Sequence, residues 1–139
     1  MKKIQLIAVA VCISLVSCAQ KGGKNAIPEV VKEAFKTSHP GVTKAHWEQE
    51  DQNFEVSFMN NKQEQSMVYD ASGKLLETEV EITMTDLPQA VKDAVANDFP
   101  KARVKETAKI TDAAGKTMYE VEIKGNDYLF NADRTKVSK

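Results

Sequence analysis

The amino-acid sequence predicts an α+β fold in which two tandem repeats, each a helix followed by an antiparallel meander, form one sheet. A proline-bounded apolar segment at 27–40 recurs at 87–100. After each copy the apolar period changes from that of a helix to two, which is typical of half-buried strands. Short turns then link the strands, and connections of this length require antiparallel pairing. We therefore expect about seven or eight strands, with both helices on one face of the sheet.

The first 17 residues have the pattern of an export signal. A basic start is followed by an apolar run over 4–16, which is too short to span a bilayer as a mature helix. Leu15-Val16-Ser17 then precedes Cys18, and this order resembles the lipobox of bacterial lipoproteins, in which the cysteine is lipidated. We expect a signal peptide at 1–17, a lipid on Cys18 and a flexible, small and polar tether at 18–25. The alternative is a plain signal peptide that is cut elsewhere.

The charge and cysteine content restrict the function classes. Removal of the signal, which holds Lys2 and Lys3 and no acidic residue, leaves 17 basic and 20 acidic residues, a net charge of −3. No basic block suggests binding to nucleic acid. Because Cys12 lies in the signal and Cys18 would carry lipid, the mature domain has no thiol for a disulfide, a metal site or a nucleophile.

The folded domain is expected at 26–139, with one repeat at 26–84 and the other at 85–139. Each repeat begins with a helix, expected at 28–38 and 88–98. Apolar residues recur there at i, i+3, i+4, i+7 and i+8, which makes a single apolar stripe. One proline fits the first turn of each helix, and a second proline ends the helix.

Three or four strands are expected after each helix. The clearest are the alternating apolar residues of Phe54–Phe58 and Tyr119–Ile123. Two-residue turns are expected at Asn60-Asn61 and Gly125-Asn126, since these residue types tolerate positive φ. The remaining strands are expected at 43–50, 65–70 and 74–82 in the first repeat, and at 102–111, 128–131 and 136–139 in the second.

These halves resemble the PepSY-like, β-lactamase-inhibitor-like family of bacterial envelope lipoproteins. The resemblance is carried by Tyr119–Ile123, by the strand and turn at Tyr69–Leu76, and by Phe130–Asp133. It implies one antiparallel sheet with an open, concave face, and a periplasm-facing, membrane-anchored position. It also implies a non-enzymatic protein that binds an envelope partner, with inhibition or modulation of an extracytoplasmic enzyme such as a peptidase as one form of that role.

The sheet face away from the helices is the candidate binding surface. Of the neighbours His46 and Trp47, only one can face away from the helices, and we expect Trp47 to pack in the core. An aromatic residue on the open face would anchor a partner. The candidate partner-binding residues are His46, Trp47, Glu55, Ser57, Met59, Lys105, Thr107, Lys109, Glu120 and Glu122.

No catalytic, metal or cofactor site is expected. The two histidines are separated, and His39 is expected to pack at a helix end, so a zinc site lacks ligands. The glutamates at 77, 79 and 81 follow one strand about 7 Å apart, which favours a solvated edge over a calcium site; a docking surface for a basic partner is the alternative. No nucleophile motif or phosphate loop is present.

Two other functions stay open at this point. One is a periplasmic sensor that binds a small ligand in the concave face. The other is a structural accessory without a discrete site. A small-ligand binder needs a mainly apolar pocket, and the polar alternation of the open face argues against one.

Overall fold

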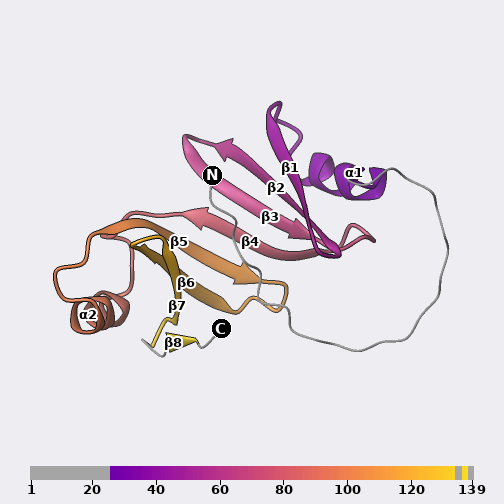
Figure 1. Cartoon of the computed structure of the whole chain (residues 1–139). Helices are drawn as coiled ribbons and strands as arrows, with labels where there is room; N and C mark the ends of the chain where they lie inside the picture. The colour runs from indigo at the N-terminus through magenta and orange to yellow at the C-terminus, as the bar shows by residue number, and fades with distance from the viewer. Residues whose placement is uncertain (1–25, 134–135, 138–139) are drawn as a thin grey trace, which may run out of the picture.

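The computed structural model describes residues 26–133 and 136–137, and in this part of the chain a helix followed by four strands occurs twice. The first set is α1 (Glu29–Ser38), β1 (Ala45–Glu50), β2 (Asn53–Asn60), β3 (Gln63–Tyr69) and β4 (Leu75–Glu81) (Figure 1). The second is α2 (Gln89–Asp98), β5 (Val104–Asp112), β6 (Thr117–Ile123), β7 (Asn126–Asn131) and β8 (Lys136–Val137). The predicted signal, Cys18 and tether lie outside the described residues, where no structural feature tests them. None of the described helices is long and apolar enough to cross a membrane.

The eight strands form one antiparallel sheet in chain order, β1 to β8. The predicted α+β class and the single sheet are therefore confirmed. The two halves meet where β4 pairs with β5, in a register that places Thr78 opposite Thr111. This pairing converts what would be two exposed sheet edges into the centre of one sheet.

Both helices start and stop at the predicted prolines. Pro28 and Pro88 precede α1 and α2, and their carbonyls accept the first helical hydrogen bonds, for example from Val31 N at 3.1 Å. Each helix ends two residues before its second proline, because a residue that precedes proline is pushed out of the helical region. His39 follows α1 and stacks on Phe35 at 5.2 Å between ring centroids, which confirms its predicted packing role.

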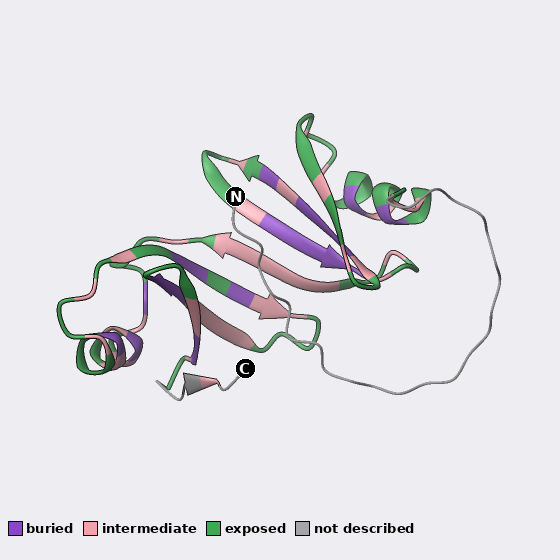
Figure 2. Cartoon of the chain, viewed as in Figure 1, coloured by how far each residue is buried: buried purple, intermediate pink, exposed green. Residues whose placement is uncertain are grey.

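The two helices cover the same face of the sheet, each over its own core (Figure 2). Register partners share a face, and one row of partners runs from Val56 through Met67, Thr78 and Thr111 to Thr117. The core under α1 contains Val31, Phe35, Phe54, Val56, Phe58, Met67 and Tyr69. The core under α2 contains Leu87, Val91, Val95, Val121, Ile123 and Phe130. These two sets share no residue, so the halves are joined mainly by the β4–β5 ladder, which we call the seam.

A β-bulge near the start of β5 overturns part of the predicted face assignment. Val104 pairs with Ile123 and Glu106 pairs with Glu122, so Lys105 is an extra residue in the strand. Beyond a bulge the alternation of side chains shifts by one. Thr107 and Lys109 therefore lie on the helix side, where the prediction that they join the open face is wrong. The buried Thr107 hydroxyl donates a hydrogen bond to the Ile82 carbonyl at 2.6 Å.

The two tight hairpin turns lie one residue away from their predicted positions. Their central residues are Asn61-Lys62 and Lys124-Gly125, and all four have positive φ, between 52° and 81°. Two consecutive residues with positive φ match the right-handed twist of the flanking strands. The shift arises because Asn60 and Asn126 take part in strand pairing, so neither is a central turn residue.

Candidate partner-binding face

The sheet face opposite the helices forms a trough of about 940 Å³. Side chains from β1 to β7 line this single hollow, so the sheet curves around it. The lining residues are Thr43, Lys44, Ala45, His46, Glu48, Glu55, Ser57, Phe58, Met59, Glu64, Glu79, Lys105, Glu106, Glu120, Glu122 and Asp127. Eight of them are acidic, against two lysines and one histidine. We call this surface the acidic trough.

The structure brings seven of the predicted binding residues together in the acidic trough: His46, Glu55, Ser57, Met59, Lys105, Glu120 and Glu122. Trp47 lies on the helix side instead, where its ring meets Phe35 edge to face at 5.5 Å. Its predicted core position is confirmed, and His46 is the member of the pair that faces the trough.

Apolar residues of β3 and β5 are buried beneath the acidic side chains of this face and do not themselves line the trough. Val68 is 4% exposed, Ala108 is 4% exposed and Ile110 is 3% exposed. No described helix or strand lies over them. Their burial has a local cause, because glutamates flank them on the neighbouring strands: Val68 lies between Glu55 and Glu77. Neighbouring strands are about 4.8 Å apart, so long side chains on both sides cover a short one between them.

Glu79 lines the acidic trough and has a strongly raised pKa. Burial, followed by repulsion from Glu120, Glu55, Glu77 and Glu106, raises its pKa to about 8. Ser66 of β3 and Ile110 of β5 are its register partners, so Glu79 belongs to the centre of the sheet. The prediction that the glutamates at 77, 79 and 81 form a solvated sheet edge is therefore wrong, because β5 covers that edge.

The pKa values of two neighbouring carboxyls, Glu55 and Glu77, are raised as well. Burial raises the pKa of Glu55, although a hydrogen bond from Ser66 opposes this rise. Burial also raises the pKa of Glu77, assisted by repulsion from Glu55 and from Asp112, its direct cross-strand partner. Like charges directly opposite one another destabilise a strand pair. The seam thus carries an electrostatic cost on the trough side.

One lysine already neutralises part of the acidic trough. Lys105 Nζ donates a hydrogen bond to Glu122 Oε2 at 2.8 Å and lies 3.7 Å from a carboxylate oxygen of Glu106. The Glu122 side chain is only 7% exposed, and its hydrogen bond raises the pKa of Lys105. The bulge makes this contact possible, since it places two consecutive residues of β5 on the trough side. The sequence carried no signal for it, because no glycine or proline marks the bulge.

Comparison with known families identifies the chain. The family model described as "Putative beta-lactamase-inhibitor-like, PepSY-like" matches residues 21–77 and 54–136. The chain belongs to the PepSY-like family. The resemblance in the sequence is thereby confirmed. No curated protein matches this PepSY-like chain at a significant level.

Several crystal structures share the fold of the PepSY-like chain. A "putative periplasmic" protein of Bacteroides eggerthii is 17% identical, with a TM-score of 0.74 over 82% of this chain and 88% of that chain. A DUF2874 family protein of Bacteroides uniformis is 18% identical, with a TM-score of 0.72 over 80% and 86%. A BLIP-like protein of Bacteroides fragilis is 20% identical, with a TM-score of 0.64 over 84% and 86%. At these identities the likeness shows the fold alone.

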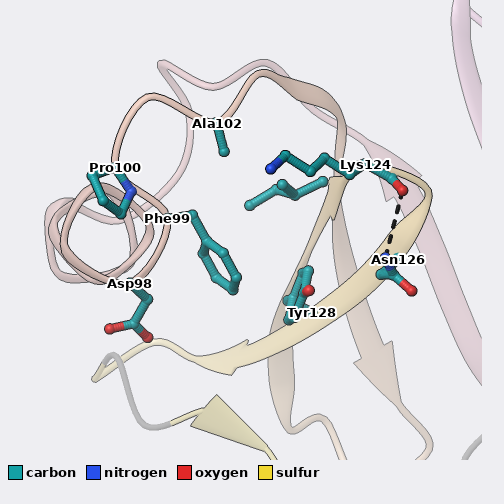
Figure 3. Close-up of a pocket in the computed structure, with 8 residues that line it drawn as sticks. Asp98, Phe99, Pro100, Ala102, Lys124, Asn126 and Tyr128 are labelled. Carbon is teal, nitrogen blue, oxygen red and sulfur yellow. Dashed lines mark hydrogen bonds between the residues drawn. The ribbon is translucent and has the colours of Figure 1, made fainter.

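A second, smaller hollow lies on the helix side of this PepSY-like protein (Figure 3). It measures about 300 Å³ and lies at the end of α2, where the Phe99 and Tyr128 rings are 4.4 Å apart. Its other lining residues are Asp98, Pro100, Ala102, Ile123, Lys124 and Asn126. It is separated from the acidic trough by the sheet, and none of the predicted binding residues lines it.

The described part of the PepSY-like chain contains no group of three or more His, Cys, Asp or Glu residues placed to hold a metal ion. The eight carboxylates of the acidic trough are spread over seven strands, β1 to β7. Calcium requires several oxygens that converge on one point. Side chains spread over seven strands do not converge in this way.

Proposed function

We propose that this PepSY-like protein is a non-enzymatic envelope lipoprotein that binds another protein through the acidic trough. One observation carries the proposal. The face opposite the helices is hollow, no described helix or strand covers it, and eight of the sixteen residues that line it are acidic. A concave surface that is lined mainly by one sign of charge attracts a partner of the opposite charge.

Exposed apolar surface at the rim supports a protein partner. Met59 lines the acidic trough and is 58% exposed, and methionine adapts well to differently shaped partners. Half of the sixteen residues that line the trough are acidic, whereas cavities that bind small molecules are lined mainly by apolar and aromatic side chains with few charges. Both features favour a macromolecular partner over a small ligand.

Inhibition or modulation of an extracytoplasmic enzyme, such as a peptidase, is the form of binding that the family suggests. The family description refers to β-lactamase inhibitors, and one neighbour of the same fold is described as BLIP-like. Another neighbour is described as periplasmic, in accord with a mature protein held by lipid on Cys18 and facing the periplasm. Fold and family description together make this a specific hypothesis about the partner.

The one arrangement in the acidic trough that resembles catalytic machinery lacks the required contacts. Ser57 lies directly across from His46, whose Nε2 is 3.1 Å from Glu48. A serine nucleophile requires a hydrogen bond to its base, and no such bond joins Ser57 to His46 in the described structure. The His46 and Glu48 side chains are also more than half exposed, so the pair is open to solvent.

Site-specific photocrosslinking in the native envelope tests the proposal. A photoreactive residue replaces Met59 in the acidic trough or, as a matched control, Val30 on α1, which is 51% exposed on the helix side. We expect the Met59 derivative to capture a discrete envelope protein and the Val30 derivative to capture none. Equal capture at the two positions contradicts the proposal. No capture, together with a shift of the melting temperature by a small envelope metabolite, would favour the ligand sensor instead.

A further inference from the structure

We propose that the partner inserts a positively charged segment into the acidic trough, and that a lysine or arginine side chain of this segment pairs with Glu79. This inference rests on the proposed function and adds to it the chemistry of the bound segment. It is argued from the shape of the trough, from the charges on its walls and from the one cation that the trough already holds.

The shape leaves room for a long side chain above the centre of the sheet. Glu79 has Ser66 and Ile110 as its neighbours on the adjacent strands, and both are buried, so that Glu79 lines the trough and neither of them does. The next carboxylates on this face, Glu55 and Glu120, belong to β2 and β6. Each of these strands is two strand spacings, about 10 Å, from β4. A guanidinium or ammonium group that binds to Glu79 would therefore have further carboxylates on both sides.

The charges favour a cation at this point over any other group. In the part of the chain that the structure describes, no lysine, arginine or histidine forms an ion pair with Glu79. Burial and four neighbouring carboxylates raise the pKa of Glu79, which means that its ionised form lacks compensation. A buried carboxylate gains most from a partner that brings an opposite charge and hydrogen-bond donors together. An acidic partner surface, or an anionic lipid, would be repelled.

Lys105 shows that this face can bind an ammonium group. Its Nζ takes a position over Glu122 and Glu106, at the β6 side of the trough. The β4 side presents a comparable set of carboxylates, Glu79 with Glu55 and Glu77. Lys105 thus serves as an internal example of the contact that we assign to the partner. The positive charge of Lys105 also weakens the attraction between the trough and a cationic partner.

Peptide binding to the whole mature protein tests the inference. The probe is a short, fluorescent, unstructured peptide in which arginine and lysine alternate with serine, and its control carries glutamate at the charged positions. We expect the cationic peptide to bind and the acidic one not to. Glu79→Gln should weaken the binding roughly tenfold or more, as the loss of one member of a buried charge pair does. Glu33→Gln removes an exposed carboxylate on α1, on the helix side, and should leave the affinity unchanged.

A second variant distinguishes the loss of a charge pair from the loss of the fold. Lys105→Ala removes the internal ammonium group, so it should tighten the binding of the cationic peptide several-fold, which a damaged fold would not do. Equal affinities for wild type and Glu79→Gln, or equal losses for Glu79→Gln and Glu33→Gln, overturn the inference. If the Met59 crosslink captures a protein while the cationic peptide fails to bind, the inference fails and the proposed function stands. If the crosslink also fails, both fail.

Discussion

At the scale of single residues, Glu79 differs most from what its local sequence suggests. It belongs to an alternating run of glutamates, which in isolation is typical of a strand that faces water. In the folded chain its pKa is raised to about 8, because it is buried and because strands from both halves surround it with other acids. Local sequence could not predict this, since the neighbours that raise its pKa come from β2, β5 and β6 as well as from β4.

The raised pKa of Glu79 predicts a pH-dependent stability. Between pH 4.5 and about 8 the folded state holds a proton that the unfolded state releases, so the free energy of unfolding falls as pH rises. Glu55, Glu77 and Glu106, whose pKa values are also raised, contribute in the same direction. Glu79→Gln removes the largest of these costs. It should raise the stability at pH 8 by about 2 kcal/mol, given about 1.4 kcal/mol per pKa unit and partial solvation of the carboxyl.

Urea denaturation of wild type and Glu79→Gln at pH 5 and pH 8 measures this effect. Glu81→Gln is the matched control, because Glu81 lies on the same strand and the same face but is exposed. The stability gain should be larger at pH 8 than at pH 5 for Glu79→Gln and absent for Glu81→Gln. Parallel pH profiles for the two variants would contradict the assigned role of Glu79.

At the scale of secondary structure elements, sequence patterns predicted the helices and most strand positions well. Prolines and apolar periodicity are local signals, so α1 and α2 begin within one residue of their predicted starts. The β5 bulge was not predictable in this way. Lys105, Thr107 and Lys109 alternate in sequence as the residues of an uninterrupted strand would, and only the pairing with β6 reveals the extra residue. Face assignments beyond the bulge failed for that reason.

The bulge predicts an unusual tolerance to deletion. Removal of Lys105 would leave Val104 on the helix side and Glu106 on the trough side, as in a regular strand, so the rest of β5 keeps its faces. We expect this deletion variant to fold, with a free energy of unfolding about 1 kcal/mol lower than that of the wild type. Deletion of Ala108, in the same strand, would move the following residues to the opposite face. That variant should lose at least about 3 kcal/mol, as large disruptions of a core do. Thermal and urea unfolding compare the two, and equal losses would contradict the bulge assignment.

At the scale of the whole molecule, the described part of the chain has two apolar cores and one acidic trough that both halves share. The cores lie under separate helices, whereas the acidic trough draws its side chains from both halves. The composition and hydrophobic pattern predicted one sheet with helices on one face, because those features follow from the repeated elements. The trough was only partly predictable, since its centre depends on the pairing of β4 with β5 across the two halves.

Separate cores predict that the halves respond separately to mutation. Val31 and Val91 are fully buried counterparts in α1 and α2. Val31→Ala should cost about 2 kcal/mol through lost burial and a small cavity, and it should accelerate amide hydrogen exchange mainly in β1 to β3. Val91→Ala should do the same in β6 and β7. Hydrogen exchange followed by mass spectrometry measures both, and uniform acceleration across the sheet in either variant would show that the cores are coupled.

The seam between β4 and β5 has a further consequence for the binding of a partner. Because the halves are joined chiefly by one pair of strands, a partner that touches both Glu55 and Glu120 spans the junction and acts as a clamp. A partner bound in the trough would then make the two weakly coupled halves unfold together. Binding would also hold the halves in place, so the halves of the free protein would be less firmly joined than those of the bound protein.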